Sequence, residues 1–523
     1  MIFNSQDYIA LLLGCVLLYW IIPNRTGRLI VMLLGSIVFY ASWDWRFLPL
    51  LYGAIVVSYA LVSLSEVRKK IAQARWAGWL ALTVTLNLVL LGIFKYTNFL
   101  LESSFLLANA AGIENREFTP LGIILPLGIS FFTFQLVAYA TDVERGLIKH
   151  EKSLLTFSVF VSFFPQLIAG PICRGQELLP QLRERQPFSV DAFVQGLLML
   201  AVGYFTKVGI ADNLAPFVDQ IYSDAGNVSG VESFYATLAF AVQIFCDFWG
   251  YSIMALGSAW LFGIMLPVNF NLPYIATSFQ TFWRRWHMTL SFWLRDYLYI
   301  TLGGNRKGTI RTYFNLAMVM ILGGLWHGAA VTFLIWGAIH GGALAIERFI
   351  SRTLRGNSSE GVSADSAWFA PFMRIIGWAI TMFIVLIAWV FFRAEGVSDA
   401  LILTQKLIGG VLNPMELYWV GLRPEIQSAF IFSVLGLALM FPLHWLNLMG
   451  NNQNFYEADP IWDLSSTEQT QTAIAYRPRN RLVAHQLSIP FPLGLKMIVT
   501  FWLFCVTYIL SAQTVTPFIY FQF

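Results

Sequence analysis

The sequence predicts an all-α polytopic membrane protein, and three observations support this fold class. The 523-residue chain is 57% hydrophobic and only 12% charged, whereas soluble globular proteins have roughly 25% charged residues. Its apolar runs are separated by short polar loops, and each is roughly long enough to cross about 30 Å of hydrocarbon as a helix. Its 45 Phe, 20 Tyr and 19 Trp are typical of helices with aromatic belts at the lipid–water boundary.

Charge and cysteine content argue against several other classes. The net charge of +4 is small, and no basic stripe indicates a nucleic-acid partner. The four cysteines are scattered without a CxxC pair, so their spacing indicates neither a disulfide framework nor a metal cluster. The N-terminus, MIFNSQDYIALLLGCVLLYWIIPNR, lacks the basic region and cleavage site of a signal peptide. We therefore interpret it as the first membrane helix, retained in the mature protein.

The N-terminal part predicts a series of membrane helices. The loop 65–76 carries mainly basic charges, which places it in the cytoplasm by the positive-inside rule. The polar stretch 102–119 then faces the opposite side. The apolar segments themselves lie near 8–23, 28–43, 48–64 and 77–100.

The region from about 120 to 345 is irregular. Prolines interrupt segments that would otherwise resemble membrane helices, which suggests half-helices, re-entrant loops and interfacial helices. Non-helical backbone survives at membrane depth only when it is buried in protein or lines a wet cavity. We therefore expect a cavity here. The interrupting prolines are Pro126, Pro165, Pro171, Pro216, Pro267 and Pro273.

The C-terminal part returns to plain apolar helices. The stretches 352–367 and 449–492 are polar and are interpreted as cytoplasmic loops. The prediction is about 11 membrane helices plus re-entrant pieces. No internal repeat is evident, which weakens a transporter interpretation. The apolar helices of this part are 371–392, 428–447 and 493–511.

These features predict one integral membrane domain over residues 1–523. Its N-terminal helices occupy 1–119, its core 120–350, and its C-terminal helices 351–523.

The stretch FQTFWRRWHMTLSFWLRDYLYI, residues 279–300, predicts an amphipathic helix. Its aromatic and aliphatic residues recur at spacings of three and four, which defines one apolar face. Arg284, His287, Ser291 and Arg295 form a polar stripe on another face. Such a helix suits a membrane interface or the wall of a polar cavity. The alternative is an ordinary surface helix on the cytoplasmic leaflet.

The following loop, TLGGNRKGTIR, combines glycines with Arg306, Lys307 and Arg311. Basic, glycine-containing loops can hold phosphate groups. They are equally common beside the cytoplasmic end of a membrane helix, and that interpretation is favoured for the loop taken alone.

His327, in GGLWHGAAVTFLIWG, is the strongest functional candidate in the chain. An ionisable residue inside a membrane segment is costly and therefore suggests function. A neutral imidazole there could accept a proton from a hydroxyl. The alternative is a core histidine with one hydrogen bond, and that interpretation is favoured for His340 in WGAIHGG. His150, His444 and His485 carry no comparable argument.

Familiar catalytic motifs are missing from the sequence. It contains no GxSxG, HExxH, P-loop or GxGxxG pattern. No histidine is followed five positions later by an aspartate, so the HxxxxD arrangement of many other acyltransferases is also absent.

The motifs that are present resemble the membrane-bound O-acyltransferase (MBOAT) family. The matching stretches are FWRRWHMTLSFWLRDYLYITLGGNR, GGLWHGAAVTFLIWGAIHG, LPLGISFFTFQLVAYATDV, FPQLIAGPICR and the terminal TPFIYFQF. Length and motifs are most similar to the branch that O-acetylates alginate, with relatives that act on peptidoglycan, cellulose or teichoic acid. The resemblance implies a ring of tilted helices around a funnel that reaches the catalytic histidine.

The resemblance also implies roles for individual residues. His327 matches the catalytic histidine, as general base or acyl carrier, and His287 matches the second motif position, which would orient the acyl carbonyl or His327. Arg284, Arg285, Arg306, Trp326 and Ser291 are candidate contacts of acetyl-CoA, the implied cytoplasmic donor. No bound cofactor or metal is implied.

The implied setting is the bacterial inner membrane. The implied partner is a periplasmic or membrane-tethered SGNH-type acetyltransferase that modifies the polysaccharide. A transporter with a histidine proton relay and a non-catalytic scaffold remain as alternatives. The acceptor polymer stays open at this point.

Overall fold

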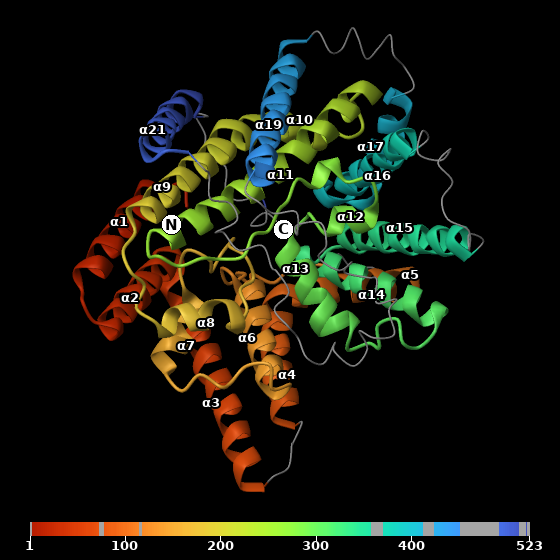
Figure 1. The fold of residues 1–523 in the computed structure, drawn as a ribbon. Helices are drawn as coiled ribbons and strands as arrows, with labels where there is room; N and C mark the ends of the chain where they lie inside the picture. Colours follow the sequence, from red (N-terminus) through yellow and green to blue (C-terminus); the bar gives the residue numbers. More distant parts are fainter. Residues whose placement is uncertain are drawn as a thin grey trace. The chain divides into compact units, whose positions relative to one another are not determined.

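The computed structural model describes residues 3–72, 78–113, 118–356, 370–411, 423–449, 491–511 and 519, and these form helices joined by loops (Figure 1). Seven helical stretches in this part of the chain are long and apolar enough to cross a membrane. Two shorter apolar helices cover Gln6–Ile21 and Pro424–Ala438. The prediction of an all-α polytopic membrane protein is confirmed.

The sequence predicted about 11 membrane helices, whereas the described residues contain seven such stretches. One reason for the difference is that two predicted segments form a single helical run. Residues Arg25–Arg68 form one 44-residue helical run. At 1.5 Å per residue, such a run is about twice as long as one crossing requires. A short 3₁₀ turn, Trp45–Phe47, divides it into α2 and α3, which correspond to the predicted segments 28–43 and 48–64.

The chain forms two compact units. The first contains the residues up to Leu200 together with Met254–Pro267, and the second contains Ala201–Ile253 and most of the chain from Val268 onward. The helices whose residues lie mainly in the first unit are α1 (Gln6–Ile21), α2 (Arg25–Asp44), α3 (Leu48–Ala72), α4 (Gly78–Leu91), α5 (Thr97–Ala110), α6 (Ile129–Glu144), α7 (Leu154–Ser162), α8 (Gly175–Arg183) and α9 (Val190–Tyr204).

The second unit holds both histidines of the family motifs. Its helices are α10 (Asp212–Tyr222), α12 (Phe279–Trp283), α13 (Met288–Trp293), α14 (Thr309–His327), α15 (Val331–Gly356), α16 (Ala370–Arg393), α17 (Val397–Val411), α19 (Pro424–Met449) and α21 (Leu493–Leu510). The long helix α11 (Gly230–Trp260) contributes residues to both units.

Side-chain caps set the beginnings of several helices in the first unit. The Ser5 hydroxyl accepts a hydrogen bond from the Tyr8 amide, and the Asn24 side chain accepts one from the Gly27 amide. Such caps satisfy backbone N–H groups that have no partner within the helix. Arg28 is buried near the start of α2, where its guanidinium donates to the carbonyl oxygens of Ile22 and Gln186. A cation at a membrane-helix end thus keeps its hydrogen bonds.

Two predicted boundaries differ from the structure. The segment predicted at 77–100 continues as helix to Ala110, through a π-helical turn at Gly92–Tyr96, so that part of the polar stretch 102–119 is helical. Pro216 does not end a helix, because α10 continues through it directly after the π-helical turn Phe205–Ala211. The other five prolines lie in loops or, like Pro273, at a helix start, as a residue without an N–H donor requires.

Several sequence features lie outside the described residues. These are most of the predicted loops 352–367 and 449–492, the terminal TPFIYFQF apart from Ile519, and the side chains of His444 and His485.

A buried group of charges links the π-helical turn before α10 to α11. The Lys207 ammonium lies 2.6 Å from a carboxylate oxygen of Asp212 and 2.6 Å from one of Asp247. All three side chains are almost fully buried. The second carboxylate oxygen of Asp247 accepts a hydrogen bond of 2.8 Å from the Ile519 amide. The group therefore connects Ile519 to two candidate membrane helices through charges that stay paired.

Removing the cation from this group is expected to destabilise the protein strongly. Lys207→Met leaves two buried carboxylates without their counter-charge, which costs about 3–5 kcal/mol for a buried pair. The control is Asp219→Asn, which breaks a pair between Arg393 and a half-exposed Asp219 and should cost about 1 kcal/mol or less. Thermal unfolding of the purified variants measures both. Equal Tm values for the two variants would contradict a structural role of Lys207.

Candidate functional site

His327 is the last residue of α14, at the point where the chain reverses into α15. The two helices form an antiparallel hairpin (Figure 1). A Cβ atom on Gly324 would lie 2.2 Å from the Phe333 carbonyl oxygen, and one on Gly328 would lie 2.0 Å from the Phe333 ring. Both contacts are far shorter than van der Waals distance, so only glycine fits. The glycines beside His327 therefore fix the turn that carries it.

His287 lies in a break between α12 and α13 and has left-handed backbone angles, with φ of 40°. The predicted continuous helix over 279–300 is wrong at this point. Backbone groups freed by the break bond to a neighbouring segment: the Met288 amide donates to Asn269 O at 2.8 Å, and the Asn271 amide donates to Arg285 O at 2.9 Å. These bonds replace those of the helix and hold His287 in a conformation that a non-glycine residue rarely adopts.

The Asn269 side chain also holds the break in place. Its amide donates to the Ser252 hydroxyl on α11 at 3.1 Å, and its carbonyl oxygen accepts a bond of 2.6 Å from the Thr289 hydroxyl. Asn269 thus joins α11 to the first turn of α13. The histidine between the two short helices is therefore anchored on both sides.

The two histidines lie close together in the interior. Their ring centroids are 6.2 Å apart, and their exposed fractions are 0% for His287 and 3% for His327. Trp326 stands beside both, at 5.9 Å from the His287 ring and 5.0 Å from the His327 ring. A group of a few atoms could contact both imidazoles at once.

Aromatic side chains from three other helices complete the surroundings. Phe248 on α11 lies 4.7 Å from the His287 ring. Trp336 on α15 and Phe392 on α16 lie 5.2 Å and 5.4 Å from the His327 ring. The imidazoles therefore sit in a low-dielectric environment, where hydrogen bonds and charges act more strongly than in water.

The state of His287 follows from this environment. Neither of its ring nitrogens has a hydrogen-bond partner among the described residues. In the sequence, His287 lies outside the candidate membrane spans, between Gly230–Trp260 and Val331–Thr353. Burial lowers its pKa to about 3. At neutral pH the ring is therefore uncharged, with one nitrogen able to donate a hydrogen bond and the other able to accept one. It is suited to hold a polar group of a substrate.

Comparison with known proteins identifies the family. Residues 136–390, which include both histidines, match MBOAT, the membrane-bound O-acyltransferase family. The chain is 35% identical to "Probable alginate O-acetylase AlgI" of Azotobacter vinelandii, over 100% of both sequences. The chain belongs to the membrane-bound O-acyltransferase family. The resemblance seen in its motifs is confirmed, and this MBOAT protein is a multi-pass membrane O-acyltransferase.

Two further relatives indicate the range of the similarity. The MBOAT chain is 36% identical to the "Probable alginate O-acetylase AlgI" of Pseudomonas aeruginosa, over 100% of both sequences. It is 39% identical to the "Peptidoglycan O-acetyltransferase" of Helicobacter pylori, over 74% of each. These names agree on acetyl transfer to a polysaccharide and differ in the polymer.

The candidate contacts of the acyl donor lie at different places in the structure. The Trp326 ring lies beside both histidine rings, and the Arg285 guanidinium donates to Asn271 O at 3.0 Å beside the break. Arg284 is half-buried in the same turn. The Ser291 hydroxyl is buried at 3.4 Å from Trp286 O. Arg306 is exposed in the loop before α14. Thus Trp326 is in contact with the histidines, whereas Arg306 lies on the surface.

The alternative of an ordinary surface helix at 279–300 is wrong. Its apolar face is buried, as expected, but His287 and Ser291 of the polar stripe are buried as well, with 0% and 3% exposure. The sequence pattern could not show this, because it reveals the polar face of a helix but not what covers that face.

His340 does not have the hydrogen bond expected of a core histidine. It is fully buried, and neither of its ring nitrogens has a partner among the described residues. Trp336 and Trp283 lie 4.7 Å and 5.2 Å from its ring. The sequence also gave no reason to include Trp389 and Phe392 of α16 in the site, since they end a segment that reads as a plain apolar helix.

Filling the hairpin is expected to disrupt the site. In Gly324→Ala the new methyl group meets a backbone carbonyl, which cannot move aside as a side chain would, and overpacking of this kind costs about 1–3 kcal/mol or more. The control is Gly342→Ala on α15, where a Cβ meets nothing within 4 Å and helix propensity favours alanine by about 0.5–1 kcal/mol. Thermal unfolding and acyl transfer of the two variants are compared. A Gly324→Ala protein as stable and active as Gly342→Ala would show that the close contact is dispensable.

Proposed function

We propose that this MBOAT enzyme takes an acetyl group from cytoplasmic acetyl-CoA and passes it across the inner membrane for O-acetylation of an extracytoplasmic polysaccharide. The observation that carries the proposal is the pair of buried imidazoles 6.2 Å apart, inside an aromatic wall. The proposal includes the arrangement that the family resemblance implies, with about 11 tilted helices around a funnel that leads to His327. The broken backbone around His287 supports it, since irregular backbone at membrane depth lines cavities.

His327 acts as the general base in this proposal. One imidazole nitrogen accepts the proton of the acceptor hydroxyl while the oxygen attacks the acetyl carbonyl carbon. The C–S bond of the thioester then breaks, and the imidazolium returns the proton to the leaving coenzyme A sulfur. The ester is formed, and His327 is neutral again. The enclosed apolar surroundings keep water away from the thioester.

His287 holds the acetyl group for this attack. Its uncharged ring donates a hydrogen bond to the carbonyl oxygen, on which negative charge develops as the hydroxyl attacks. The left-handed turn and the bonds to Asn269 and Asn271 fix the ring before the substrate arrives. A donor that needs no reorganisation contributes more to catalysis than a flexible one.

The donor enters from the cytoplasmic side. Arg284 and Arg285 in the break, and Arg306 in the exposed loop before α14, are the proposed contacts for the phosphates of coenzyme A, with Trp326 and Ser291 nearer the acyl end. A cationic entrance attracts an anionic donor.

Alginate is the proposed acceptor polymer, and an SGNH-type acetyltransferase outside the membrane is the proposed partner that completes the modification. The full-length similarity to the two alginate O-acetylases supports this choice. Peptidoglycan is the second candidate, favoured by the relative from Helicobacter pylori, which is similar over 74% of the chain. Cellulose would require the same chemistry at the site.

Substitution of the two histidines tests the chemistry. His327→Ala should lower acetyl transfer from acetyl-CoA to the acceptor or partner by about 10²–10⁴-fold, the usual contribution of a general base. His287→Asn should keep part of the activity, because an amide N–H can still donate to the carbonyl oxygen. The control is His150→Gln, since His150 contacts the Tyr139 hydroxyl in the first unit and takes no part in the proposal.

The measurement uses radiolabelled acetyl-CoA with the full-length protein in vesicles. Wild-type rates in His327→Ala would contradict the assignment of the base. A loss in His287→Asn equal to that in His327→Ala would overturn the orienting role of His287. Label that stays on the wild-type protein without any acceptor, and not on His327→Ala, would replace the general-base step by an acetyl group carried on His327.

A further inference from the structure

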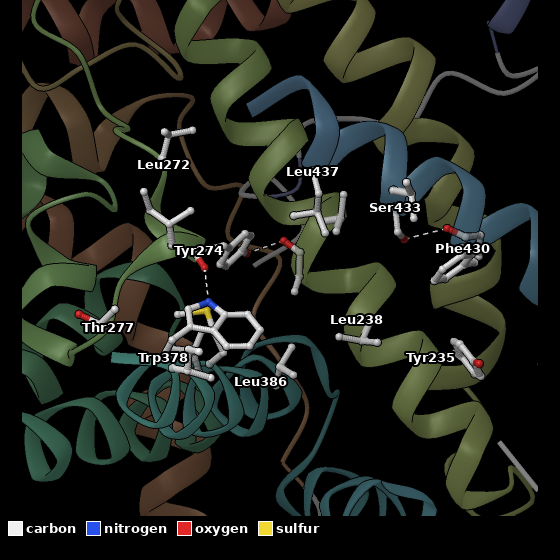
Figure 2. Close-up of a pocket in the computed structure, with 18 of the residues that line it drawn as sticks. Tyr235, Leu238, Leu272, Tyr274, Thr277, Trp378, Leu386, Phe430, Ser433 and Leu437 are labelled. Carbon is white, nitrogen blue, oxygen red and sulfur yellow. Dashed lines mark hydrogen bonds between the residues drawn. The ribbon is translucent and has the colours of Figure 1, made fainter. Parts of the chain in front are cut away.

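An apolar groove in the second unit is lined by residues that do not include the two histidines. It has a volume of about 630 Å³, within the range of sites that hold small ligands. α11, α16 and α19 form its walls, and the segment around Tyr274 forms its floor (Figure 2). The lining side chains include Tyr235 and Leu238, Trp378 and Leu386, and Phe430 and Leu437.

The groove opens toward the surroundings of the protein. On its rim, Phe430 is 55% exposed and Trp378 is 45% exposed, whereas Val385 and Ile426 deeper inside are buried. Two of the walls, α11 and α16, are candidate membrane spans. A groove that opens between two candidate membrane spans is expected to face the hydrocarbon of the bilayer.

The polar groups that line the groove are mostly bound to the protein itself. Trp378 Nε1 donates to Tyr274 O at 2.8 Å, the Tyr274 hydroxyl donates to Ala241 O, and the Ser433 hydroxyl donates to Ala429 O at 2.7 Å (Figure 2). The two bonds of Tyr274 tie the floor to α16 and α11. A ligand inside the groove consequently meets an apolar surface.

One cation stands at the edge of this surface. Arg374 lines the groove from the beginning of α16, is exposed, and forms no hydrogen bond or ion pair with any described residue. Trp378, one turn further along the helix, is placed as tryptophans commonly are at the level of lipid headgroups. An apolar groove that ends at an unpaired arginine complements a molecule with a long apolar chain and an anionic head.

The size of the groove argues against a helix as its occupant. A helix of about 10 Å diameter and 5.4 Å pitch fills roughly 400 Å³ per turn. The groove, at about 630 Å³, is much smaller than the volume of a membrane-spanning helix of about 20 residues. An acyl chain is much thinner and can follow such a groove over its length.

We propose that this groove binds an anionic phospholipid, with an acyl chain between α11, α16 and α19 and the phosphate on Arg374. The lipid belongs to the cytoplasmic leaflet, because α16 begins directly after the segment 352–367, which the sequence places in the cytoplasm. Arg348 and Arg352 at the end of α15 add positive charge to the helix pair α15–α16. The negative potential of that leaflet favours such basic sites.

The bound lipid supports the wall of the active site from behind. The Tyr274 ring on the floor of the groove lies 6.1 Å from the Trp286 ring and 5.7 Å from the Phe245 ring. Trp286 directly precedes His287 and lies 4.9 Å from the Trp389 ring. One layer of aromatic rings thus separates the lipid chain from the turn that carries His287.

Lipid retention by the purified protein tests this site. The full-length protein in mild detergent is stripped of lipid, incubated with phosphatidylglycerol or phosphatidylcholine of identical chains, and examined by native mass spectrometry. We expect one phosphatidylglycerol per protein, retained at least fivefold better than phosphatidylcholine. Arg374→Gln should abolish this preference and leave phosphatidylcholine retention unchanged. Ala429→Phe, which places a ring in the groove, should lower the retention of both lipids.

Two control variants match these substitutions. Arg311→Gln removes another exposed arginine, on α14, and Ala379→Phe adds a ring on an exposed part of α16 that does not line the groove. Both should retain lipid as the wild type does, and all variants should elute and unfold like folded protein. Equal retention of the two lipids by the wild type, or unchanged retention in Ala429→Phe, would overturn the proposal. A polypeptide that co-purifies at one copy and is displaced by Ala429→Phe would also overturn it.

Discussion

The contact between the backbones of α14 and α15 is the constraint on which the site depends. Besides Gly324, a Cβ on Gly337 would lie 2.4 Å from Met320 O, and one on Gly341 would lie 2.9 Å from Ala317 Cα. Glycines on both helices thus allow an approach that no other residue permits, as small residues do at helix interfaces in membranes. His327 lies at the end of α14 where the two helices meet, so the position of its backbone is set by this packing.

The second histidine is fixed by a different device. The helix that the sequence pattern favours is interrupted at His287, and the positive φ angle there costs on the order of 1–3 kcal/mol. Backbone bonds to Asn269 and Asn271 and the Asn269 side chain offset that cost. The break in the helix brings His287 close to His327 at the end of α14. The same break therefore causes both the local backbone strain and the pairing of the two imidazoles.

The sequence was informative where hydrophobicity or glycine decides the structure, and silent where a distant segment decides it. Apolar length predicted α16 and α21 nearly to the residue, and the family motifs indicated His287 and His327. The break at His287 could not be predicted, since the aromatic spacing across it is helical and the competing hydrogen bonds come from residues 269–271. Pro216 was also misleading, because it lies inside α10, which directly follows a π-helical turn.

The indole groups near the histidines help to distinguish a purely structural core from a ligand-binding interior. Trp283, Trp286, Trp336 and Trp389 are buried, and the ring N–H of each lacks an acceptor among the described residues. A buried donor without a partner costs about 1–3 kcal/mol. A region selected for stability alone would replace such residues with phenylalanine or leucine. Trp283 and Trp336 lie beside His340, Trp286 directly precedes His287, and Trp389 packs against Trp286. A polar guest that accepts their hydrogen bonds would account for these four donors. The acyl thioester proposed as the donor has an amide-containing arm, whose carbonyl groups are acceptors of this kind. The proposed donor would therefore offset the cost of these unpaired indole groups.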